Sequence, residues 1–125
     1  MPEGSYKELK MTINEAISSI DETHINTVSF EQKKRWLCEA EAWVMRDIML
    51  ADVPEALYAD AEGDEVLLAP LPFDALYPAY LDAQLYYVYR EFSEYAAAAE
   101  RFDRLFAEYA GWYAEKYHPA CKTAE

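Results

Sequence analysis

The chain has 125 residues, of which 53% are hydrophobic, and this length suffices for one domain with a single modest core. Its formal net charge of -13 argues against binding to a nucleic-acid backbone, where affinity comes from Lys and Arg. No stretch approaches the roughly 18 apolar residues that a membrane-spanning helix requires, so no membrane partner is expected.

The first two helices are predicted from capping signals followed by apolar residues at helical spacing. The helix over Thr12–Asp21 begins with a capping box formed by Thr12 and Glu15, and the next helix spans Ser29–Leu50. This second helix has one apolar face for the core and a weaker apolar row behind it. Because a globular helix needs only one buried stripe, the row is a candidate oligomer interface. The predicted core face includes Trp36, Ala40 and Trp43, and the row comprises Cys38, Ala42, Met45 and Met49.

The segment that follows is strongly acidic, with seven carboxylates and no Lys or Arg between Ala51 and Ala75. Solubility is the ordinary interpretation, and a surface that a polyanion must pass without sticking is the more specific one. Residues 66–68 are expected to be extended, without an evident pairing partner. A linker of about twenty residues is long for a compact domain, and such loops are often functional. The candidates for a lumen-lining or docking loop are Asp52, Glu55, Asp60, Glu62, Asp64 and Glu65.

The stretch APLPFDALYPAYLDAQLYYVYREF, Ala69–Phe92, predicts a third helix with five tyrosines. Asp74 is expected to be its N-cap, which puts Pro78 in the first turn, where the missing N–H costs little. Apolar side chains cover most of the circumference, so this helix is expected to be enclosed or to face two neighbours. The sector of Leu76, Tyr80 and Tyr87 is assigned to the core, and the adjoining sector of Leu81, Leu85, Val88 and Phe92 is a second candidate interface.

A fourth helix is predicted over Tyr95–Tyr117, with one apolar and one charged side. No glycine or proline marks a turn between Arg90 and Tyr95, so the third and fourth helices are either separate or one bent helix. The expected fold is all-α, a small bundle of three to four helices with two long antiparallel C-terminal helices and a long acidic loop before them. The predicted core residues of the fourth helix are Phe102, Phe106, Tyr109 and Tyr113.

A single helical domain is expected over residues 11–119, between a loose extension over 1–10 and a tail over 120–125. The chain has two cysteines, Cys38 in a predicted helix and Cys121 in the tail. They do not make a disulfide framework, and a reducing compartment is the simpler expectation.

Candidate catalytic and metal-binding constellations are weak. His118 and Cys121 are separated by two residues, but the sequence supplies no convincing further ligands for zinc. Phosphate-cradling glycine loops and nucleophile elbows are absent. We therefore expect neither enzymatic activity nor a cofactor. The tyrosines do not suit base stacking, because Arg90 is the only cation between Arg46 and Arg101, and we interpret them as packing residues, partly at an interface with a partner.

Three stretches occur in the order RWLCEAEAWV, LLAPLPFDALYPAYLDAQLYY and REFSEYAAAAERFDRLFAEYAGWYAEKYHP. Together they resemble the small head–tail connector, or neck adaptor, proteins of long-tailed bacteriophages and prophages, over about Thr12–Pro119. The chain departs from the family pattern at Phe73, where tyrosine is expected, at Ala96 and Ala97, which replace asparagines, and at Arg90, where glycine is frequent. The matching positions are Arg35, Trp36, Leu37, Glu39, Leu67, Leu68, Pro70, Pro72, Asp74, Leu76, Tyr77, Tyr80, Glu91, Tyr95, Phe102, Tyr109 and Tyr113.

This resemblance implies a virion structural protein without enzymatic activity, located in the virion neck and, during assembly, in the host cytoplasm. The implied assembly is a ring, expected to be twelvefold, with the portal protein above it, a tail or stopper protein below it and genomic DNA passing through without specific binding. A ring beyond twofold needs two different lateral surfaces, and the two candidate interfaces meet that requirement. The alternative is an acidic helical regulator or DNA mimic that binds a basic partner.

Overall fold

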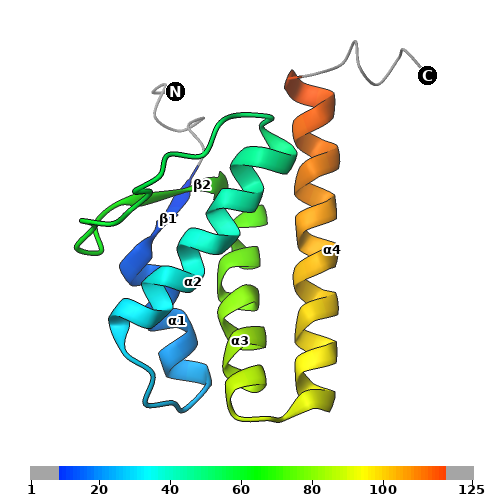
Figure 1. Ribbon diagram of the computed structural model, residues 1–125. Coiled ribbons are helices and arrows are strands. Elements are labelled where there is room, and N and C mark those ends of the chain that lie inside the picture. Colours follow the sequence, from blue (N-terminus) through cyan, green and yellow to red (C-terminus); the bar gives the residue numbers. More distant parts are fainter. Residues whose placement is uncertain (1–8, 118–125) are drawn as a thin grey trace, which may run out of the picture.

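The computed structural model describes residues 9–117, which form four α-helices and one two-stranded sheet (Figure 1). A π-helical turn, Val44–Ile48, continues the second helix, and a 3-10 turn, Phe73–Ala75, precedes the third. The predicted all-α class is confirmed, including the two antiparallel C-terminal helices. The elements are β1 (Lys10–Thr12), α1 (Ile13–Thr23), α2 (Phe30–Trp43), β2 (Val66–Pro70), α3 (Leu76–Val88) and α4 (Phe92–Tyr117).

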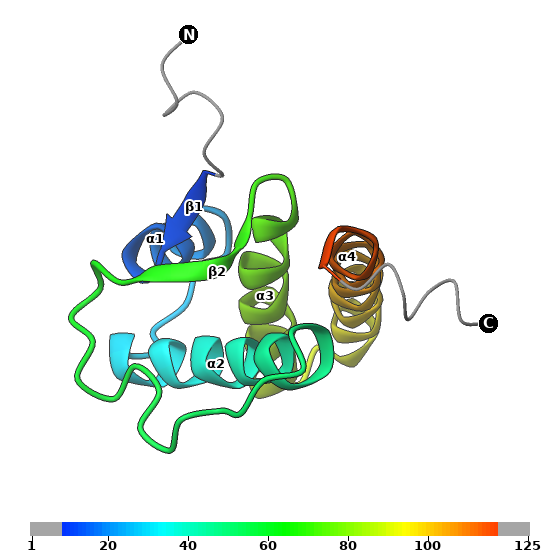
Figure 2. The same cartoon turned by 90° about the horizontal axis from the view of Figure 1, so that it is seen from above.

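Helix α3 lies in the middle of the molecule (Figures 1 and 2). Helices α1 and α2 pack against one side of α3, and α4 packs against the other side. Up to Leu85, both apolar sectors predicted for α3 therefore face neighbours within the same chain. This arrangement explains a helix that is apolar around most of its circumference, because it is enclosed on two sides.

The starts of α1 and α2 follow their capping signals. The Thr12 N–H donates to the Glu15 carboxylate at 2.9 Å, and the Glu15 N–H donates to the Thr12 hydroxyl at 3.1 Å, which completes the predicted capping box. Ser29 caps α2 by accepting from the Gln32 N–H at 3.1 Å. The end of α2 differs from the prediction, since the regular α-helix stops at Trp43 and the π-helical turn carries the chain on.

Two details of the third and fourth helices were not as expected from the sequence. The prediction that Asp74 is the N-cap of α3 is wrong, because Asp74 lies inside the 3-10 turn and Ala75 is the cap residue. Pro78 is nevertheless in the first turn of α3, as predicted. Helix α4 begins at Phe92, three residues earlier than the predicted Tyr95.

The extended residues 66–68 do have a pairing partner. They belong to β2, which runs antiparallel to β1, with Thr12 opposite Val66 and an irregularity between Thr12 and Lys10. The carbonyl of Leu9 also accepts from the Leu71 N–H at 2.7 Å. Leu9 and Lys10 are thus part of the folded unit and not of a loose extension, whereas residues 1–8 and the predicted tail lie outside the described residues.

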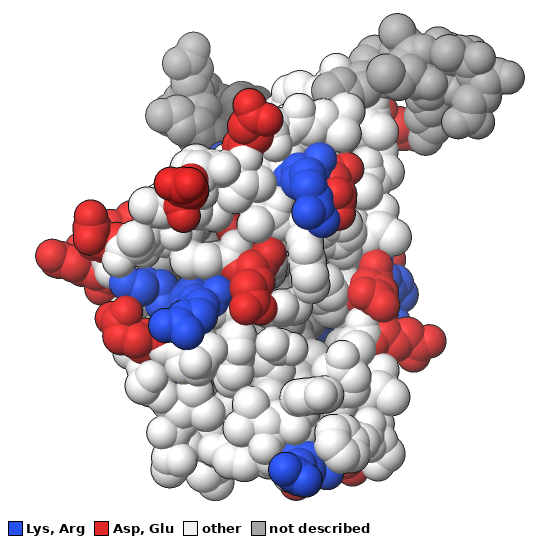
Figure 3. Space-filling model, in the orientation of Figure 1, with Lys and Arg blue, Asp and Glu red and all other residues white. Residues whose placement is uncertain are grey.

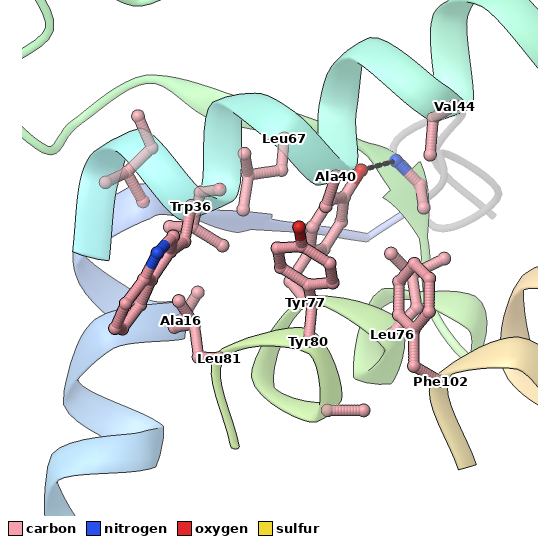
Figure 4. Packing of buried hydrophobic residues seen from close by; sticks show 14 of the residues in the cluster. Ala16, Trp36, Ala40, Val44, Leu67, Leu76, Tyr77, Tyr80, Leu81 and Phe102 are labelled. Atoms are coloured by element: carbon pink, nitrogen blue, oxygen red, sulfur yellow. Dashed lines mark hydrogen bonds between the residues drawn. The ribbon is translucent and has the colours of Figure 1, made fainter. Parts of the chain in front are cut away.

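The core forms where α3 meets its neighbours (Figure 4). Phe106 and Tyr113 are half-buried against it, and Trp43 is 38% exposed although its ring centroid lies 5.5 Å from that of Tyr80. The assignment of Tyr87 to the core is wrong, since this side chain is 57% exposed, near the point where α3 ends. The remaining predicted core residues are buried, namely Trp36, Ala40, Leu76, Tyr80, Phe102 and Tyr109.

Helices α3 and α4 are separate, joined by a turn centred on Arg90. The Glu91 N–H donates to the Tyr86 carbonyl at 2.9 Å and the Arg90 N–H donates to the Tyr87 carbonyl at 3.0 Å, which is the Schellman pattern of helix termination. Arg90 has a φ of 63°, in the left-handed region that glycine adopts most easily. The sequence did not decide between two helices and one bent helix, because Arg90 occupies the position where a glycine usually indicates the end of a helix.

Candidate functional site

Among the described residues, the most deeply buried ionisable side chain on α2 is Glu41, which is inaccessible to solvent. The Tyr77 hydroxyl of α3 donates to Glu41 Oε1 at 2.5 Å. The Leu68 N–H of β2 and the Tyr58 hydroxyl donate to Glu41 Oε2 at 2.8 and 2.9 Å. Tyr77 in turn accepts from the Ala69 N–H at 2.9 Å, the bond drawn in Figure 4. One carboxyl therefore ties α2 to β2, to α3 and to the loop that carries Tyr58.

The electrostatics of this cluster are set by burial. Burial raises the pKa of the Glu41 carboxyl, while the hydrogen bonds from Tyr77, Leu68 and Tyr58 and the positive charge of Lys10 lower it. Burial and the neighbouring Glu41 also raise the pKa of both tyrosine hydroxyls. Tyr58 and Tyr77 are therefore neutral donors at physiological pH. Glu41 is inaccessible to solvent, and its hydrogen bonds position the neighbouring elements.

Sequence reasoning did not single out Glu41, although a signal was present. Leu37, Glu41, Val44 and Ile48 follow one another at intervals of four, three and four residues, so a carboxyl interrupts the apolar face of the helix. A charged residue on such a face is either paired or hydrogen-bonded when it is buried. Its partners could not be read from the sequence, because they come from segments that only the fold brings together.

The acidic loop, defined here as residues 51–65, runs along the outside of α2 and is fastened to it by polar contacts. The Lys34 ammonium, buried on α2, donates to the carbonyls of Ala59 and Ala61 at 3.2 and 3.0 Å. The Cys38 thiol lies 3.2 Å from the carbonyl of Leu57. The loop therefore covers part of the apolar row that the sequence offered as an interface, and Cys38, Ala42, Met45 and Met49 are all half-buried.

The end of the acidic loop closes onto the start of α1. The Asn14 N–H donates to the Gly63 carbonyl at 2.9 Å, and the Ile13 N–H donates to the Glu65 carbonyl at 3.0 Å. Gly63 has a φ of 122°, and a Cβ there would lie 2.2 Å from the Asn14 side chain. Only glycine fits this contact.

The carboxylates of the acidic loop gather on one side of the molecule (Figure 3). Five of the six candidate side chains are exposed and Glu65 is half-buried. The Glu65 carboxylate accepts from the Gly63 N–H at 3.1 Å, and such backbone hydrogen bonds lower its pKa. The exposed ones are Asp52, Glu55, Asp60, Glu62 and Asp64.

The residues of the second candidate interface differ in their exposure to solvent. Leu81 and Leu85 are fully buried between α3 and its neighbours, so their assignment to an interface is wrong. They point inward because both faces of α3 are covered. Val88 and Phe92, in contrast, are 49% and 55% exposed at the turn between α3 and α4.

An apolar patch, defined here as Tyr87, Val88, Tyr89 and Phe92, covers this end of the molecule. Each of the four side chains is at least 40% exposed. A surface hollow of about 470 Å³ lies among Tyr87, Val88, Arg90 and Phe92. The Tyr89 hydroxyl accepts from the Thr27 N–H at 3.1 Å, which fixes the turn against the loop between α1 and α2. Figure 3 shows few charged side chains at this lower end. This exposed apolar patch is a candidate contact surface.

His24 contacts two side chains of α3. His24 Nδ1 lies 2.6 Å from the Asp82 carboxylate and its ring packs 4.5 Å from that of Tyr86. Within residues 9–117, no three His, Cys, Asp or Glu side chains are grouped to hold a metal ion. The pair His118 and Cys121 lies outside the described residues.

No described helix combines the length and the apolar character needed to cross a membrane. The chain matches no protein-family model, no curated protein and no solved structure.

Proposed function

We propose that this chain is a structural subunit of the head–tail connector of a bacteriophage or prophage. Its copies form a ring beneath the portal protein, expected to be twelvefold, which joins the capsid to the tail and lets the genome pass. The upper neighbour is the portal and the lower neighbour is a tail or stopper protein. The site of action is the virion neck, reached through the host cytoplasm during assembly.

The observation that carries this proposal is the apolar patch at the turn between α3 and α4. A chain with a net charge of -13 repels its own copies unless an apolar contact offsets that repulsion. The three aromatic side chains and one valine of the patch, each at least 40% exposed around the Schellman turn, supply such a contact surface. Tyrosine and phenylalanine are also among the residues enriched at protein interfaces.

A ring also requires a second, different surface on the same subunit. Leu50 and Leu71 are 68% and 57% exposed, at the points where α2 has ended and α3 is about to begin. Those points lie toward the opposite end of the molecule from the apolar patch (Figure 1). Exposed apolar side chains at separate places favour a heterologous contact over a twofold one.

The exposed carboxylates of the acidic loop fit a channel that conducts DNA. Residues 51–65 carry six carboxylates and no Lys or Arg, although Arg35 of α2 lies beside the loop. A surface with such an excess of carboxylates repels phosphates, so the genome can move past it without binding. In the proposed ring the acidic loop faces the lumen or the rim.

The test is the mass of the protein in solution, measured by light scattering over a concentration series, with and without the portal protein from the same genome. The expected result is a discrete ring or a complex with the portal assembly. A monomer at all concentrations that ignores the portal would contradict the connector role.

The alternative is an acidic helical regulator or DNA mimic. The specific observation in its favour is the same set of exposed carboxylates in the acidic loop. A basic partner could bind these negative charges in place of the phosphates of DNA. Stoichiometric binding to a basic DNA-binding protein, lost at high salt and unaffected by changes in the apolar patch, would favour this alternative over the connector.

A further inference from the structure

The hydroxyl of Tyr58 is placed between two acceptors. It lies 2.9 Å from Glu41 Oε2 and 3.1 Å from the carbonyl oxygen of Val66. A phenol has a single proton to donate, so it cannot donate to both acceptors at once. Which acceptor receives the proton depends on whether the Glu41 carboxyl is ionised.

Each protonation state of Glu41 has its own hydrogen-bond arrangement. When Glu41 is ionised, the Tyr58 hydroxyl donates to the carboxylate and the Val66 carbonyl receives no proton from it. When Glu41 is protonated on Oε2, the carboxyl donates to the Tyr58 oxygen, and Tyr58 donates onward to Val66. The protonated state therefore links α2, Tyr58 and β2 in one chain of hydrogen bonds.

Ionisation also places a negative charge beneath a loop that is already acidic. The acidic loop carries six carboxylates and no Lys or Arg. A buried charge at Glu41 lies in an environment of low dielectric, where its repulsion is screened less than at the surface. Two cations face this cluster, Lys10 from β1 and Lys34 on α2, and they offset part of the repulsion. The other ionisable groups around it are Tyr58 and Glu65 from the loop, Tyr77 from α3, Tyr109 from α4, and Cys38 and Glu39 on α2 itself.

We propose that Glu41 is a proton-controlled latch for the acidic loop. The loop is held closed on α2 while Glu41 carries its proton, and it opens more readily when Glu41 is ionised. Opening removes Tyr58 and lets water reach the carboxyl, which then releases its proton to the solvent. Closing takes one proton up again. The latch does not depend on the connector role, since it follows from contacts within one chain.

The direction of the pH dependence follows from the complete burial of Glu41 in the closed form, which disfavours the charged carboxylate and so raises its pKa. The closed form keeps its proton above the ordinary value of 4.5, while the opened, hydrated carboxyl does not. Closure is therefore most favourable below pH 4.5, weakens as the pH rises through the pKa of the closed form, and changes no further above it.

Two backbone amides report on the loop alone. The Ala59 N–H donates to the Ala56 carbonyl at 3.0 Å and the Ala61 N–H donates to the Tyr58 carbonyl at 3.1 Å, so both are protected only while the loop keeps its shape. Their hydrogen-exchange protection factors should be measured by NMR from pH 5 to pH 8. A protection factor is corrected for the intrinsic pH dependence of exchange, and amides of α4 serve as the internal reference.

We expect the protection of Ala59 and Ala61 to fall as the pH rises, by up to about tenfold per pH unit for the release of one proton. Glu41→Gln should abolish this slope, because an amide does not titrate. Absolute protection in that variant should be lower, since the Gln amide cannot satisfy Leu68, Tyr58 and Tyr77 together. The slope is therefore the readout, once circular dichroism shows that the variant is folded.

The matched control is Glu39→Gln. Glu39 lies on the same helix and accepts from the Tyr80 hydroxyl at 2.7 Å, but its side chain is exposed, so this variant should keep the wild-type slope. Tyr58→Phe should lower the protection of the loop at every pH, because it removes the link to Glu41 and to Val66. A flat wild-type profile, a slope that survives in Glu41→Gln, or undiminished protection in Tyr58→Phe would each overturn the proposal.

Discussion

The two ends of α3 carry the same residue type in opposite roles. Tyr77, in the first turn, is fully buried and its hydroxyl both donates to Glu41 and accepts from the backbone of β2. Tyr87, in the last turn, is 57% exposed, and its ring packs edge-on against the rings of Phe92 and Tyr95 at the start of α4. The first end holds the domain together, and the second end presents apolar surface to solvent.

The difference arises from neighbours and not from the helix itself. Along its first three turns α3 lies between α1 and α2 on one side and α4 on the other, so every apolar side chain finds a partner. Past Leu85 the chain turns back through Arg90, and α1 and α2 no longer cover it. Tyrosine suits both places because it joins an apolar ring to a polar hydroxyl.

The largest effect is expected in the buried part of α3. Leu81→Ala removes a fully buried side chain and should lower the free energy of unfolding by about 2–5 kcal/mol. Urea denaturation followed by circular dichroism measures this loss. Leu50→Ala is the control, because Leu50 is 68% exposed and its truncation should change stability by less than about 0.5 kcal/mol. Equal effects of the two changes would contradict the burial described for α3.

The next largest loss of stability is expected when the hydroxyl group of a buried tyrosine is removed. Tyr77→Phe leaves Glu41 Oε1 and the Ala69 N–H without their partner and should cost about 1–3 kcal/mol of stability. Tyr87→Phe should be neutral, because the side chain is exposed and no group within residues 9–117 forms a hydrogen bond with its hydroxyl. Thermal melting of both variants checks this. A neutral Tyr77→Phe would mean that the hydroxyl does not hold Glu41.

A smaller effect of opposite sign is expected at the turn. Arg90 has a φ of 63°, so Arg90→Gly should remove the strain of a left-handed residue and stabilise the protein by about 0.5–1 kcal/mol net of the extra chain entropy. Arg90→Ala keeps a Cβ and should give no such gain. A loss of stability in the glycine variant would show that the Arg90 side chain, and not the backbone, secures the turn.

The smallest change in stability is expected at the apolar patch, where the effect falls on assembly. The double variant Val88→Lys with Phe92→Glu places charges that suit the ends of α3 and α4, so folding should change by less than about 0.5 kcal/mol. Light scattering should then show loss of self-association or of portal binding. Val66→Lys is the matched control, since Val66 is 49% exposed, the same as Val88. Unchanged assembly in the double variant would move the interface elsewhere.

Local chemistry in the sequence accounts for the helices and for much of the core. The Thr12 and Glu15 box, the Ser29 cap and the apolar spacing around Trp36 and Phe102 act between neighbours in the chain, so they predict where helices begin and which faces are buried. The sequence also shows the acidic loop and, through its resemblance to connector proteins, suggests the function that we propose.

Tertiary structure alone decided the remaining assignments. Whether Leu81 and Leu85 face a partner or the core depends on α1, α2 and α4 surrounding α3, which no spacing within α3 reveals. Glu41 acquires its three donors from segments 17, 27 and 36 residues away. Burial and long-range hydrogen bonds are properties of the packed chain, because the groups involved meet only after it has folded.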